Sequence, residues 1–332
     1  MKRNFLRTLL ACTVAGLTAT AGTAWAQAKL DKVTVASWGR AISEVTNLLV
    51  EEEKGFFRAR GIELVYLPGA GGGDAVRNLL SGQGDVAFTD PGSFYIALDK
   101  GEKLRAIYDV YPQNIFNVVA LKSSGISKPA DLKGKKIGVY SLSSGTRTSL
   151  QVLLHGAGLS EKDVTLVPTG LLNFAPLMQG QVDASAATDT GLLVARARGV
   201  GEVNVMEARD SLNMSSDLFV VREETWQQRK DVLRRFLAAY RDSAQWMIDN
   251  PQEAARLAVK RAIDGQNEAV NLEVIKLRNA SSVSPLTRKE GLGAIDIDAL
   301  QKGADTWKKI GLIQNDLRMR DVVSGELLPG RK

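Results

Sequence analysis

Residues 82–90 read Gly-Gln-Gly-Asp-Val-Ala-Phe-Thr-Asp, and residues 180–189 read Gly-Gln-Val-Asp-Ala-Ser-Ala-Ala-Thr-Asp. Both stretches begin with Gly-Gln-x-Asp, continue as a short apolar run and end in Thr-Asp. A run of this kind, bounded by turn residues and followed by a helical pattern, is typical of a buried strand in a parallel sheet. Because the same unit occurs twice, far apart in the chain, we expect two similar α/β lobes.

Strands and helices alternate on both sides of these two stretches. In the first half, apolar runs at 33–38, 62–67 and 104–111 predict strands, and helical spacing predicts a helix over 44–60. The chain becomes mainly helical from residue 223 onward. Between these parts lie predicted strands at 135–140, 164–169, 182–188 and 203–208, and predicted helices that end at 158, 179 and 198. The alternation predicts two mostly parallel sheets flanked by helices.

The composition excludes several kinds of chemistry. The chain has 332 residues, which predicts about two domains, and its single cysteine and single histidine are Cys12 and His155. A disulfide framework, a cysteine nucleophile and a metal site built from cysteine or histidine are therefore not expected. No nucleophile motif or metal-ligand cluster is visible in the sequence. We expect a protein that is not an enzyme, with no catalytic residue, no metal and no cofactor.

The N-terminus has the features of an export signal. Lys2, Arg3 and Arg7 make it basic, residues 8–23 are uncharged, and Ala24-Trp25-Ala26 fits the small-x-small cleavage rule. We expect a signal peptide at 1–26, cleavage after Ala26 and a product in the periplasm. Cleavage would lower the net charge from +6 to +3, because 43 Lys and Arg become 40 against 37 Asp and Glu. Such a charge is too small for nucleic-acid binding, so no nucleic acid is expected as a partner.

Two variants of the export route stay open. Lys2-Arg3 resembles a weakened twin-arginine signal. Leu9-Leu10-Ala11-Cys12 resembles a lipid-attachment site at Cys12, although the apolar run before it is short. The general secretory route is the preferred alternative.

The glycine-rich loop at 69–73 does not fit a nucleotide-binding motif. The phosphate-loop pattern requires Lys and then Ser or Thr after the last glycine, and the dinucleotide pattern requires glycine at position 74. The chain has Asp74 and Ala75 there, and Asp74 is expected to cap the following helix. Two interpretations remain: a turn without a ligand, or a loop in which Gly71 lets a ligand approach the backbone.

The loop between the predicted strand at 135–140 and the next helix is a stronger candidate for ligand binding. Its hydroxyl and basic residues are Ser143, Ser144, Thr146 and Arg147, grouped around Gly145. The free N–H groups and partial positive charge of a helix N-terminus favour an anion. The alternative is simple capping of the helix by a hydroxyl group. If the anion interpretation is correct, Arg147→Ala and Ser144→Ala each weaken binding.

Residues that follow other predicted strands are also candidates, because ligands of parallel α/β sheets collect at the carboxyl ends of the strands. Trp38 is expected either to stack on a flat ligand or to pack in the core. Asp90 and Asp189 are expected either to bind an amine or hydroxyl of the ligand or to cap the following helices. The candidates of this kind are Trp38, Gly39, Arg40, Thr89, Asp90, Thr188 and Asp189.

Several longer motifs are shared with a known family. They are Glu-Lys-Gly-Phe-Phe at 53–57, Gly-Ile-Glu-Leu-Val at 61–65, Leu-Leu-Ser-Gly-Gln-Gly-Asp-Val-Ala-Phe at 79–88, Gly-Ile-Ser-Lys followed by Pro-Ala-Asp-Leu-Lys-Gly-Lys-Lys-Ile-Gly-Val at 125–139, and Ser-Ser-Gly-Thr at 143–146. Their order resembles the exported solute-binding proteins of ABC importers, in the branch of nitrate-, sulfonate-, taurine- and thiamine-pyrimidine-type receptors. The part at 129–139 is the most specific.

This resemblance implies a two-lobed periplasmic-binding-protein fold of type II. It places lobe 1 at 27–116 and 219–332, lobe 2 at 117–218, and two hinge crossovers near 113–119 and 214–221. The lobes would close like a Venus flytrap on a ligand in the cleft, and the closed form would dock as a monomer on an ABC permease in the inner membrane. Asn117, in the first crossover, is a further expected ligand residue.

The resemblance leaves the ligand and the role partly open. Arg40 and Arg147 favour a small organic anion, such as a sulfonate or carboxylate, which is the preferred ligand class. Asp90 and Asp189 suit an amine or a pyrimidine instead. A sensor that signals to a partner protein and, less favoured, an enzyme on the same scaffold are the alternative roles. The eukaryotic branch that makes the thiamine pyrimidine needs a cysteine-rich stretch, which the chain lacks, so synthase activity is not expected.

Overall fold

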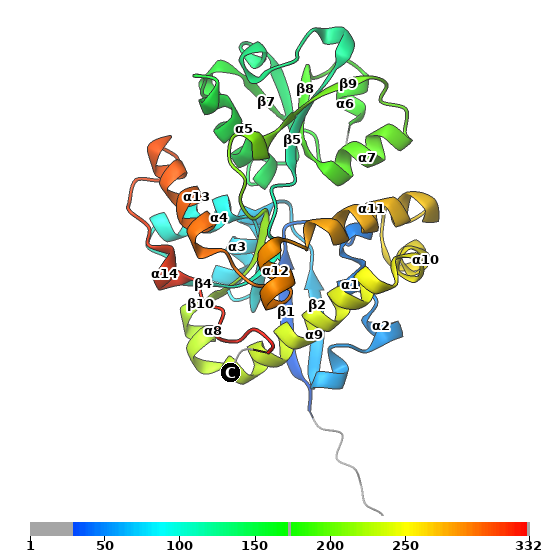
Figure 1. Ribbon diagram of the computed structural model, residues 1–332, viewed down its shortest axis with the longest axis vertical. Helices are drawn as coiled ribbons and strands as arrows, with labels where there is room; N and C mark the ends of the chain where they lie inside the picture. The colour runs from blue at the N-terminus through cyan, green and yellow to red at the C-terminus, as the bar shows by residue number, and fades with distance from the viewer. Residues whose placement is uncertain (1–28, 172–173, 331–332) are drawn as a thin grey trace, which may run out of the picture.

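The computed structural model describes residues 29–171 and 174–330, so the predicted signal peptide at 1–26 lies outside the described residues. The strands are β1 (Asp31–Ser37), β2 (Ile62–Leu67), β3 (Val86–Thr89), β4 (Leu104–Tyr111), β5 (Phe116–Leu121), β6 (Lys136–Val139), β7 (Thr165–Pro168), β8 (Ala184–Thr188), β9 (Val203–Glu207) and β10 (Asp217–Arg222). They form two five-stranded sheets, each the centre of a separate body in Figure 1. We call the body around β2-β1-β3-β10-β4 lobe 1, and the body around β7-β6-β8-β5-β9 lobe 2.

In each sheet, four strands run in one direction and one runs against them. In lobe 1, β1 pairs in parallel with β2 and β3, while β10 is antiparallel to β3 and β4. In lobe 2, β6 pairs in parallel with β7 and β8, while β5 is antiparallel to β8 and β9. The prediction of two mostly parallel sheets flanked by helices is confirmed.

The reversed strands lie where the chain changes lobe. Residues 112–115 lead from β4 of lobe 1 to β5 of lobe 2, and residues 208–216 lead back from β9 to β10. The predicted crossovers at 113–119 and 214–221 overlap these segments, but both extend into strands that were not predicted. The exact lobe boundaries stay a prediction. In the structure, Phe116 already pairs with Thr188 in lobe 2, and Asp217 already pairs with Tyr111 in lobe 1.

Helices flank both sheets (Figure 1). The 3₁₀ helices are η1 (Ser43–Val45), η2 (Arg58–Arg60), η3 (Lys122–Ser124), η4 (Pro129–Leu132), η5 (Glu161–Asp163) and η6 (Ala208–Asp210). The α-helices are α1 (Thr46–Leu49), α2 (Glu51–Lys54), α3 (Gly72–Leu80), α4 (Pro91–Asp99), α5 (Gly145–Gly156), α6 (Ala175–Met178), α7 (Asp189–Ala197), α8 (Glu223–Gln228), α9 (Lys230–Asp249), α10 (Pro251–Arg261), α11 (Glu268–Ser281), α12 (Pro285–Glu290), α13 (Ile297–Lys309) and α14 (Met319–Val322). The last seven of these follow β10 and pack on lobe 1, so the C-terminal part of the chain completes the lobe that its N-terminal part begins.

Two local predictions were wrong. The single helix predicted over 44–60 is divided into η1, α1, α2 and η2, because Val50 leaves helical geometry and Gly55 adopts a left-handed conformation with φ of 67°. The predicted cap Asp74 lies inside α3, which begins two residues earlier. Its carboxylate instead accepts a hydrogen bond from the Ala70 N–H at 2.9 Å and pairs with Arg77 at 2.7 Å. The helix start predicted at Pro91 is confirmed.

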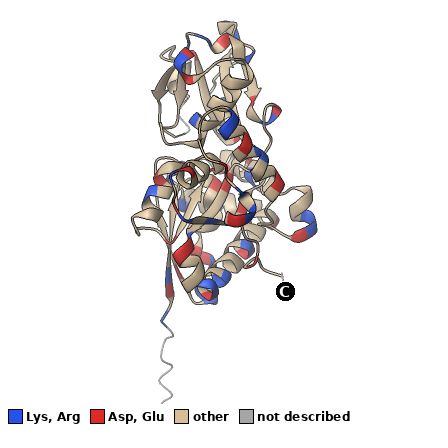
Figure 2. Ribbon diagram, turned by 90° about the vertical axis from the view of Figure 1, so that its left-hand side faces the viewer, with Lys and Arg blue, Asp and Glu red and all other residues tan. Residues whose placement is uncertain are grey.

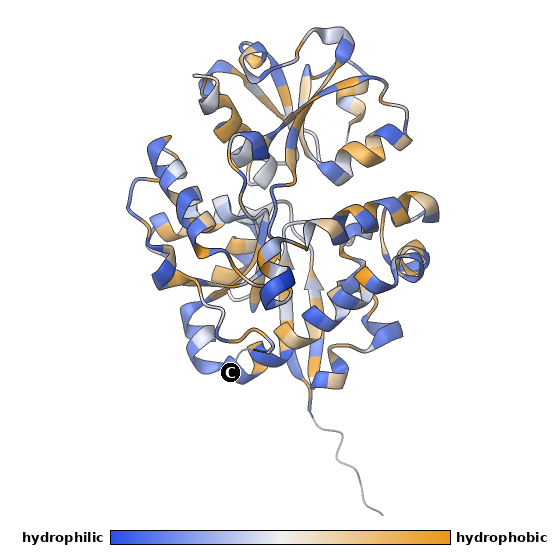
Figure 3. Ribbon diagram, viewed as in Figure 1, coloured by the Kyte–Doolittle hydropathy of each residue, from blue (hydrophilic) through white to orange (hydrophobic). Residues whose placement is uncertain are grey.

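Apolar side chains fill the interior of both lobes, where the strands and the facing sides of the helices are hydrophobic (Figure 3). In lobe 1, the rings of Phe219 and Tyr240 meet edge to face, with centroids 4.6 Å apart. Lys and Arg are interspersed with Asp and Glu over both lobes (Figure 2). In the part of the chain that the structure describes, no helix combines the length and the hydrophobicity needed to cross a membrane.

Candidate functional site

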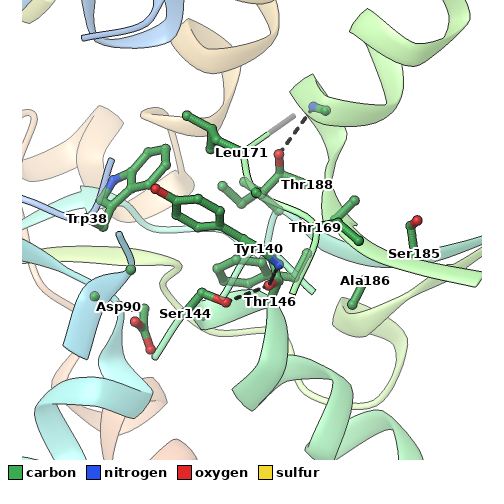
Figure 4. Close-up of a pocket in the computed structure, with 18 of the residues that line it drawn as sticks. Trp38, Asp90, Tyr140, Ser144, Thr146, Thr169, Leu171, Ser185, Ala186 and Thr188 are labelled. Atoms are coloured by element: carbon green, nitrogen blue, oxygen red, sulfur yellow. Dashed lines mark hydrogen bonds between the residues drawn. The ribbon is translucent and has the colours of Figure 1, made fainter. Parts of the chain in front are cut away.

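A cavity lies between the two lobes, at the carboxyl ends of the parallel strands. The space between its walls is about 710 Å³, part of which is open solvent. Half of the fourteen predicted ligand residues line it: Trp38, Gly71, Asp90, Ser144, Gly145, Thr146 and Thr188. Their role in binding stays a prediction. Figure 4 shows Trp38 and Asp90 on one side of the cavity, Thr169 and Thr188 on the other, and Tyr140 between them.

Lobe 1 contributes Trp38 and Asp90, each directly after a strand. The Asp90 carboxylate caps α4, because Oδ1 accepts a hydrogen bond from the Ser93 N–H at 2.9 Å and Oδ2 accepts one from the Ser93 hydroxyl at 2.7 Å. Gly72 leaves room for the Asp90 carboxylate, since a Cβ on residue 72 would lie 1.9 Å from Asp90 Oδ2. Burial raises the pKa of Asp90, which the bonds from Ser93 only partly offset. Lobe 1 therefore holds a fixed carboxyl group in the cavity wall.

Lobe 2 contributes the turn between β6 and α5. Thr146 Oγ1 accepts a hydrogen bond from the Tyr140 N–H at 3.1 Å and lies 2.7 Å from Ser144 Oγ. This network fixes the turn, and the Tyr140 ring extends from it into the cavity (Figure 4). Thr188, at the end of β8, caps α7 by accepting a hydrogen bond from the Gly191 N–H at 3.2 Å. The hydroxyl groups near the cavity are thus largely engaged in structural hydrogen bonds.

The other predicted ligand residues do not line the cavity. The guanidinium of Arg147 binds both carboxylate oxygens of Glu161, with Nη2 2.9 and 3.0 Å from them. Thr89 donates a hydrogen bond to the backbone oxygen of Gly72 at 2.9 Å, and Arg40 is exposed. The remaining residues outside the lining are Gly39, Asn117, Ser143 and Asp189. The two cations on which the predicted anion site depends are therefore absent from the cavity wall.

Several residues that line the cavity were not predicted. Glu44, in η1, and Asp217, at the start of β10, add two carboxyl groups, and these residues are only 2% and 4% exposed. Phe116, Leu171 and Phe174 add apolar surface from lobe 2. No Lys, Arg or His belongs to the lining among the described residues. The cavity is therefore aromatic and acidic.

A buried ion cluster joins the lobes beside the cavity. Nη2 of Arg278, in α11 of lobe 1, donates hydrogen bonds to Glu44 Oε2 at 3.1 Å and to Asp189 Oδ1 at 3.0 Å in lobe 2. Thr190 accepts from the same Nη2 at 2.9 Å and donates to Glu44 Oε2 at 2.7 Å. The fully buried Arg278 guanidinium also lies 4.8 Å from the centre of the Tyr111 ring. We call Glu44, Asp189, Thr190 and Arg278 the arginine cluster. Asp189, which was predicted to bind ligand, is instead bonded to Arg278 within this cluster.

The glycine-rich loop forms a second contact between the lobes. Three hydrogen bonds join it to the turn after β6: Gly73 N–H to Ser143 O (2.9 Å), Tyr140 O–H to Gly69 O (3.1 Å) and Ser141 O–H to Ala70 O (2.5 Å). Gly71 has φ of 129°, and a Cβ on it would lie 2.5 Å from Ser143 O. The glycines of this loop therefore allow the backbones of the two lobes to approach each other closely. The lobes are in contact through both this loop and the arginine cluster.

The profile of the NMT1/THI5-like family matches residues 42–254. The chain belongs to this family. A relative, the riboflavin-binding protein RibY of Chloroflexus aurantiacus, is 25% identical over 92% of this chain and 88% of that protein. The 4-amino-5-hydroxymethyl-2-methylpyrimidine phosphate synthase THI5 of Saccharomyces cerevisiae is 20% identical over 62% of this chain and 64% of that protein.

Solved structures establish which fold this NMT1/THI5-like protein has. The alkanesulfonate-binding protein SsuA of Xanthomonas axonopodis pv. citri, bound to MOPS, is 18% identical and has a TM-score of 0.69. The alignment covers 90% of this chain and 99% of SsuA. The fold is that of the periplasmic binding proteins, as the resemblance implied.

In this NMT1/THI5-like chain, no group of three or more Asp, Glu, His or Cys suited to a metal ion occurs within 29–171 and 174–330.

Proposed function

We propose that this chain is an exported solute-binding receptor that captures a small molecule between its lobes and delivers it to an ABC importer in the inner membrane. Three observations support the proposal: membership of the NMT1/THI5-like family, the fold shared with SsuA, and a cavity lined by both lobes. A ligand in that cavity contacts both lobes and so favours the conformation in which they meet. Location in the periplasm, cleavage after Ala26 and action as a monomer belong to the same proposal.

The ligand that the cavity fits best is a flat nitrogen heterocycle, neutral or positively charged, rather than the small organic anion expected from the sequence. The observation that carries this proposal is the presence of Glu44, Asp90 and Asp217 in the lining, with no described basic side chain among them. Carboxyl oxygens accept hydrogen bonds from N–H groups, which sulfonates and nitrate lack. Trp38 and Tyr140 supply aromatic surface on which a flat ring stacks.

The names of two sequence relatives agree with this ligand class. RibY is named for riboflavin, and the yeast synthase is named for an aminopyrimidine phosphate, whose ring belongs to this class although its phosphate group is an anion. Riboflavin and the aminopyrimidine both contain a flat ring with N–H donors at its edge. SsuA, which is named for alkanesulfonates, is similar to this chain in fold, and 18% identity does not extend its ligand to this cavity.

We further propose that the chain releases its ligand unchanged. The yeast relative is named as a synthase, so an enzyme is the alternative that the comparisons favour most. Within the described lining, the carboxyl groups of Asp90 and Glu44 are engaged with Ser93, Thr190 and Arg278. These hydrogen bonds hold the two carboxyl groups in place, which supports a role in positioning the ligand. Transport and sensing share this binding step, and a neighbouring permease or kinase gene would distinguish them.

A thermal-shift screen with recovery of the ligand tests binding without conversion. The screen uses riboflavin, 4-amino-5-hydroxymethyl-2-methylpyrimidine, MOPS, taurine and nitrate. We expect riboflavin or the aminopyrimidine to raise the melting temperature, because a ligand at one hundred times its dissociation constant stabilises a fold by about 2.7 kcal/mol. Chromatography after overnight incubation should return that ligand unchanged. A new product would make the protein an enzyme, and a shift with sulfonates alone would contradict the proposed ligand class.

A further inference from the structure

Asp217 occupies a distinctive place in the cavity. It is the first residue of β10, and because β10 runs against β3, its N-terminal end lies beside the carboxyl end of β3. It also directly follows the crossover at 208–216, and it pairs with Tyr111 at the end of β4. Asp217 lines the cavity although the residue is only 4% exposed. Asp217 therefore belongs to the sheet of lobe 1 and lies where the crossover at 208–216 enters that sheet.

The hydrogen bonding of Asp217 differs from that of the other two carboxyl groups in the lining. Asp90 accepts hydrogen bonds from the N–H and hydroxyl of Ser93. Glu44 accepts them from Thr190 and Arg278. In the described part of the chain, no donor makes a hydrogen bond to the side chain of Asp217. Asp217 is 4% exposed and has little contact with solvent, so a ligand donor that reaches its carboxyl group adds a hydrogen bond that no protein group supplies.

We propose that Asp217 is the specificity-determining residue of the cavity, where it accepts a hydrogen bond from a ring or exocyclic N–H of the bound heterocycle. This inference rests on the proposed function, and it identifies which atom of the protein recognises the ligand. A sulfonate or a nitrate ion offers oxygen acceptors only, so it donates no hydrogen bond to the carbonyl oxygen of Asp217. An N-methylated heterocycle is rejected for the same reason, because its edge no longer carries the hydrogen atom.

The electrostatic surroundings of Asp217 favour the same class of ligand. Burial raises the pKa of Asp217 well above its usual range, the nearby carboxylates of Asp90, Glu44 and Asp109 raise it further, and Arg278 opposes them. An oxygen of the group accepts an N–H in either protonation state, since a protonated carboxyl group keeps its carbonyl oxygen. An anion entering the cavity meets these carboxyl groups with no described cation in the wall. Recognition at Asp217 therefore works for neutral and positively charged rings alike.

The test compares a heterocycle with its N-methylated analogue on the purified protein. The probe is riboflavin or 4-amino-5-hydroxymethyl-2-methylpyrimidine, whichever binds more tightly. The analogue carries methyl in place of every hydrogen on the nitrogen, which is the single hydrogen of the riboflavin ring N–H or both hydrogens of the exocyclic amine of the pyrimidine. We expect the analogue to bind about ten to one hundred times more weakly than the parent compound. Asp217→Ala should lose a similar factor for the parent, and should bind both compounds with nearly equal affinity.

Asp109→Ala is the matched control. Asp109 is also a buried carboxyl group of the lobe 1 sheet, 1% exposed, and it does not line the cavity. We expect this variant to bind the parent compound with the wild-type affinity. If the Asp217→Ala variant does not fold, the wild-type comparison of parent and analogue still decides the question.

The possible results separate this inference from the proposed function. If the wild type binds the parent but binds the analogue equally well, the role of Asp217 is overturned and the proposed ligand class stands. The same conclusion follows if Asp217→Ala keeps the wild-type affinity for the parent. If the wild type binds neither heterocycle, the proposed ligand class fails, and the inference fails with it.

Discussion

Replacing Arg278 with methionine is expected to lower the free energy of unfolding by about 3–5 kcal/mol, because it leaves buried carboxylates without their cation. Arg278 is fully buried, and Glu44, to which it donates a hydrogen bond, is only 2% exposed. Methionine fills part of the same space but provides no donor. Asp189 is less buried, with a side chain that is 19% exposed, so most of the loss comes from Glu44. Urea unfolding followed by circular dichroism measures the difference.

A matched arginine elsewhere in the chain provides the control. Arg147 forms an ion pair with Glu161 on lobe 2, where both side chains are about one-third exposed. Arg147→Met should cost about 0–1 kcal/mol, since partly exposed pairs contribute little. In the double variant with Glu44→Gln, the loss caused by Arg278→Met should be smaller, because the buried negative charge is removed as well. Equal stabilities of Arg278→Met and Arg147→Met would contradict the importance of the arginine cluster.

The stability of the protein is expected to fall between pH 5 and pH 8, and Asp109 is one identified cause, beside Asp90 and Asp217, whose pKa values burial also raises. Burial raises the pKa of Asp109 to about 8, against the lowering effect of its hydrogen bond from Ser215. The folded state therefore keeps a proton that the unfolded state releases above about pH 4. Because the folded state binds more protons in this window, stability decreases as the pH rises, by up to about 1.4 kcal/mol per pH unit, until the folded pKa is passed.

Asp109→Asn should reduce this fall, since asparagine is neutral at every pH. The measurement is the free energy of unfolding in urea at pH 5 and pH 8 for both proteins. Asp99 provides a control of opposite sign, because backbone N–H groups of Asn315 and Gln314 lower the pKa of its exposed carboxyl group. Its contribution is lost only at lower pH, so Asp99→Asn should leave the fall between pH 5 and pH 8 unchanged. An undiminished fall in Asp109→Asn would show that other groups cause it.

Local sequence patterns predicted most of the fold because each strand and helix carries its own signal. The repeated Gly-Gln-x-Asp stretches end in β3 and β8, which lie at equivalent central positions in the two sheets. The strands β5 and β10 were missed, although Phe116–Leu121 and Asp217–Arg222 are mostly apolar. Each of them pairs with strands from a distant part of the chain. Their place in the fold depends on topology, which a local pattern does not contain.

The candidate site was predictable where a residue directly follows a parallel strand or lies in the loop between that strand and the next helix. Trp38, Asp90 and Thr188 reach the cavity in this way, since the carboxyl ends of the strands face it. Asp217 begins an antiparallel strand, so this rule does not select it. Arg147 follows a strand as well, but its partner Glu161 lies fourteen residues later and draws its charge away from the cavity. The pairing of Asp189 with Arg278 joins residues 89 positions apart and appears only once the lobes are in contact.

The most direct measurement of the central claim is isothermal titration calorimetry of the purified protein with three compounds in one buffer. The compounds are riboflavin, 4-amino-5-hydroxymethyl-2-methylpyrimidine and MOPS. The acidic, aromatic lining around Asp90 and Asp217 predicts saturable binding of at least one heterocycle, with one molecule bound per chain, and no binding heat from MOPS. Saturable binding of MOPS, with no heat from either heterocycle, would contradict the proposed ligand class.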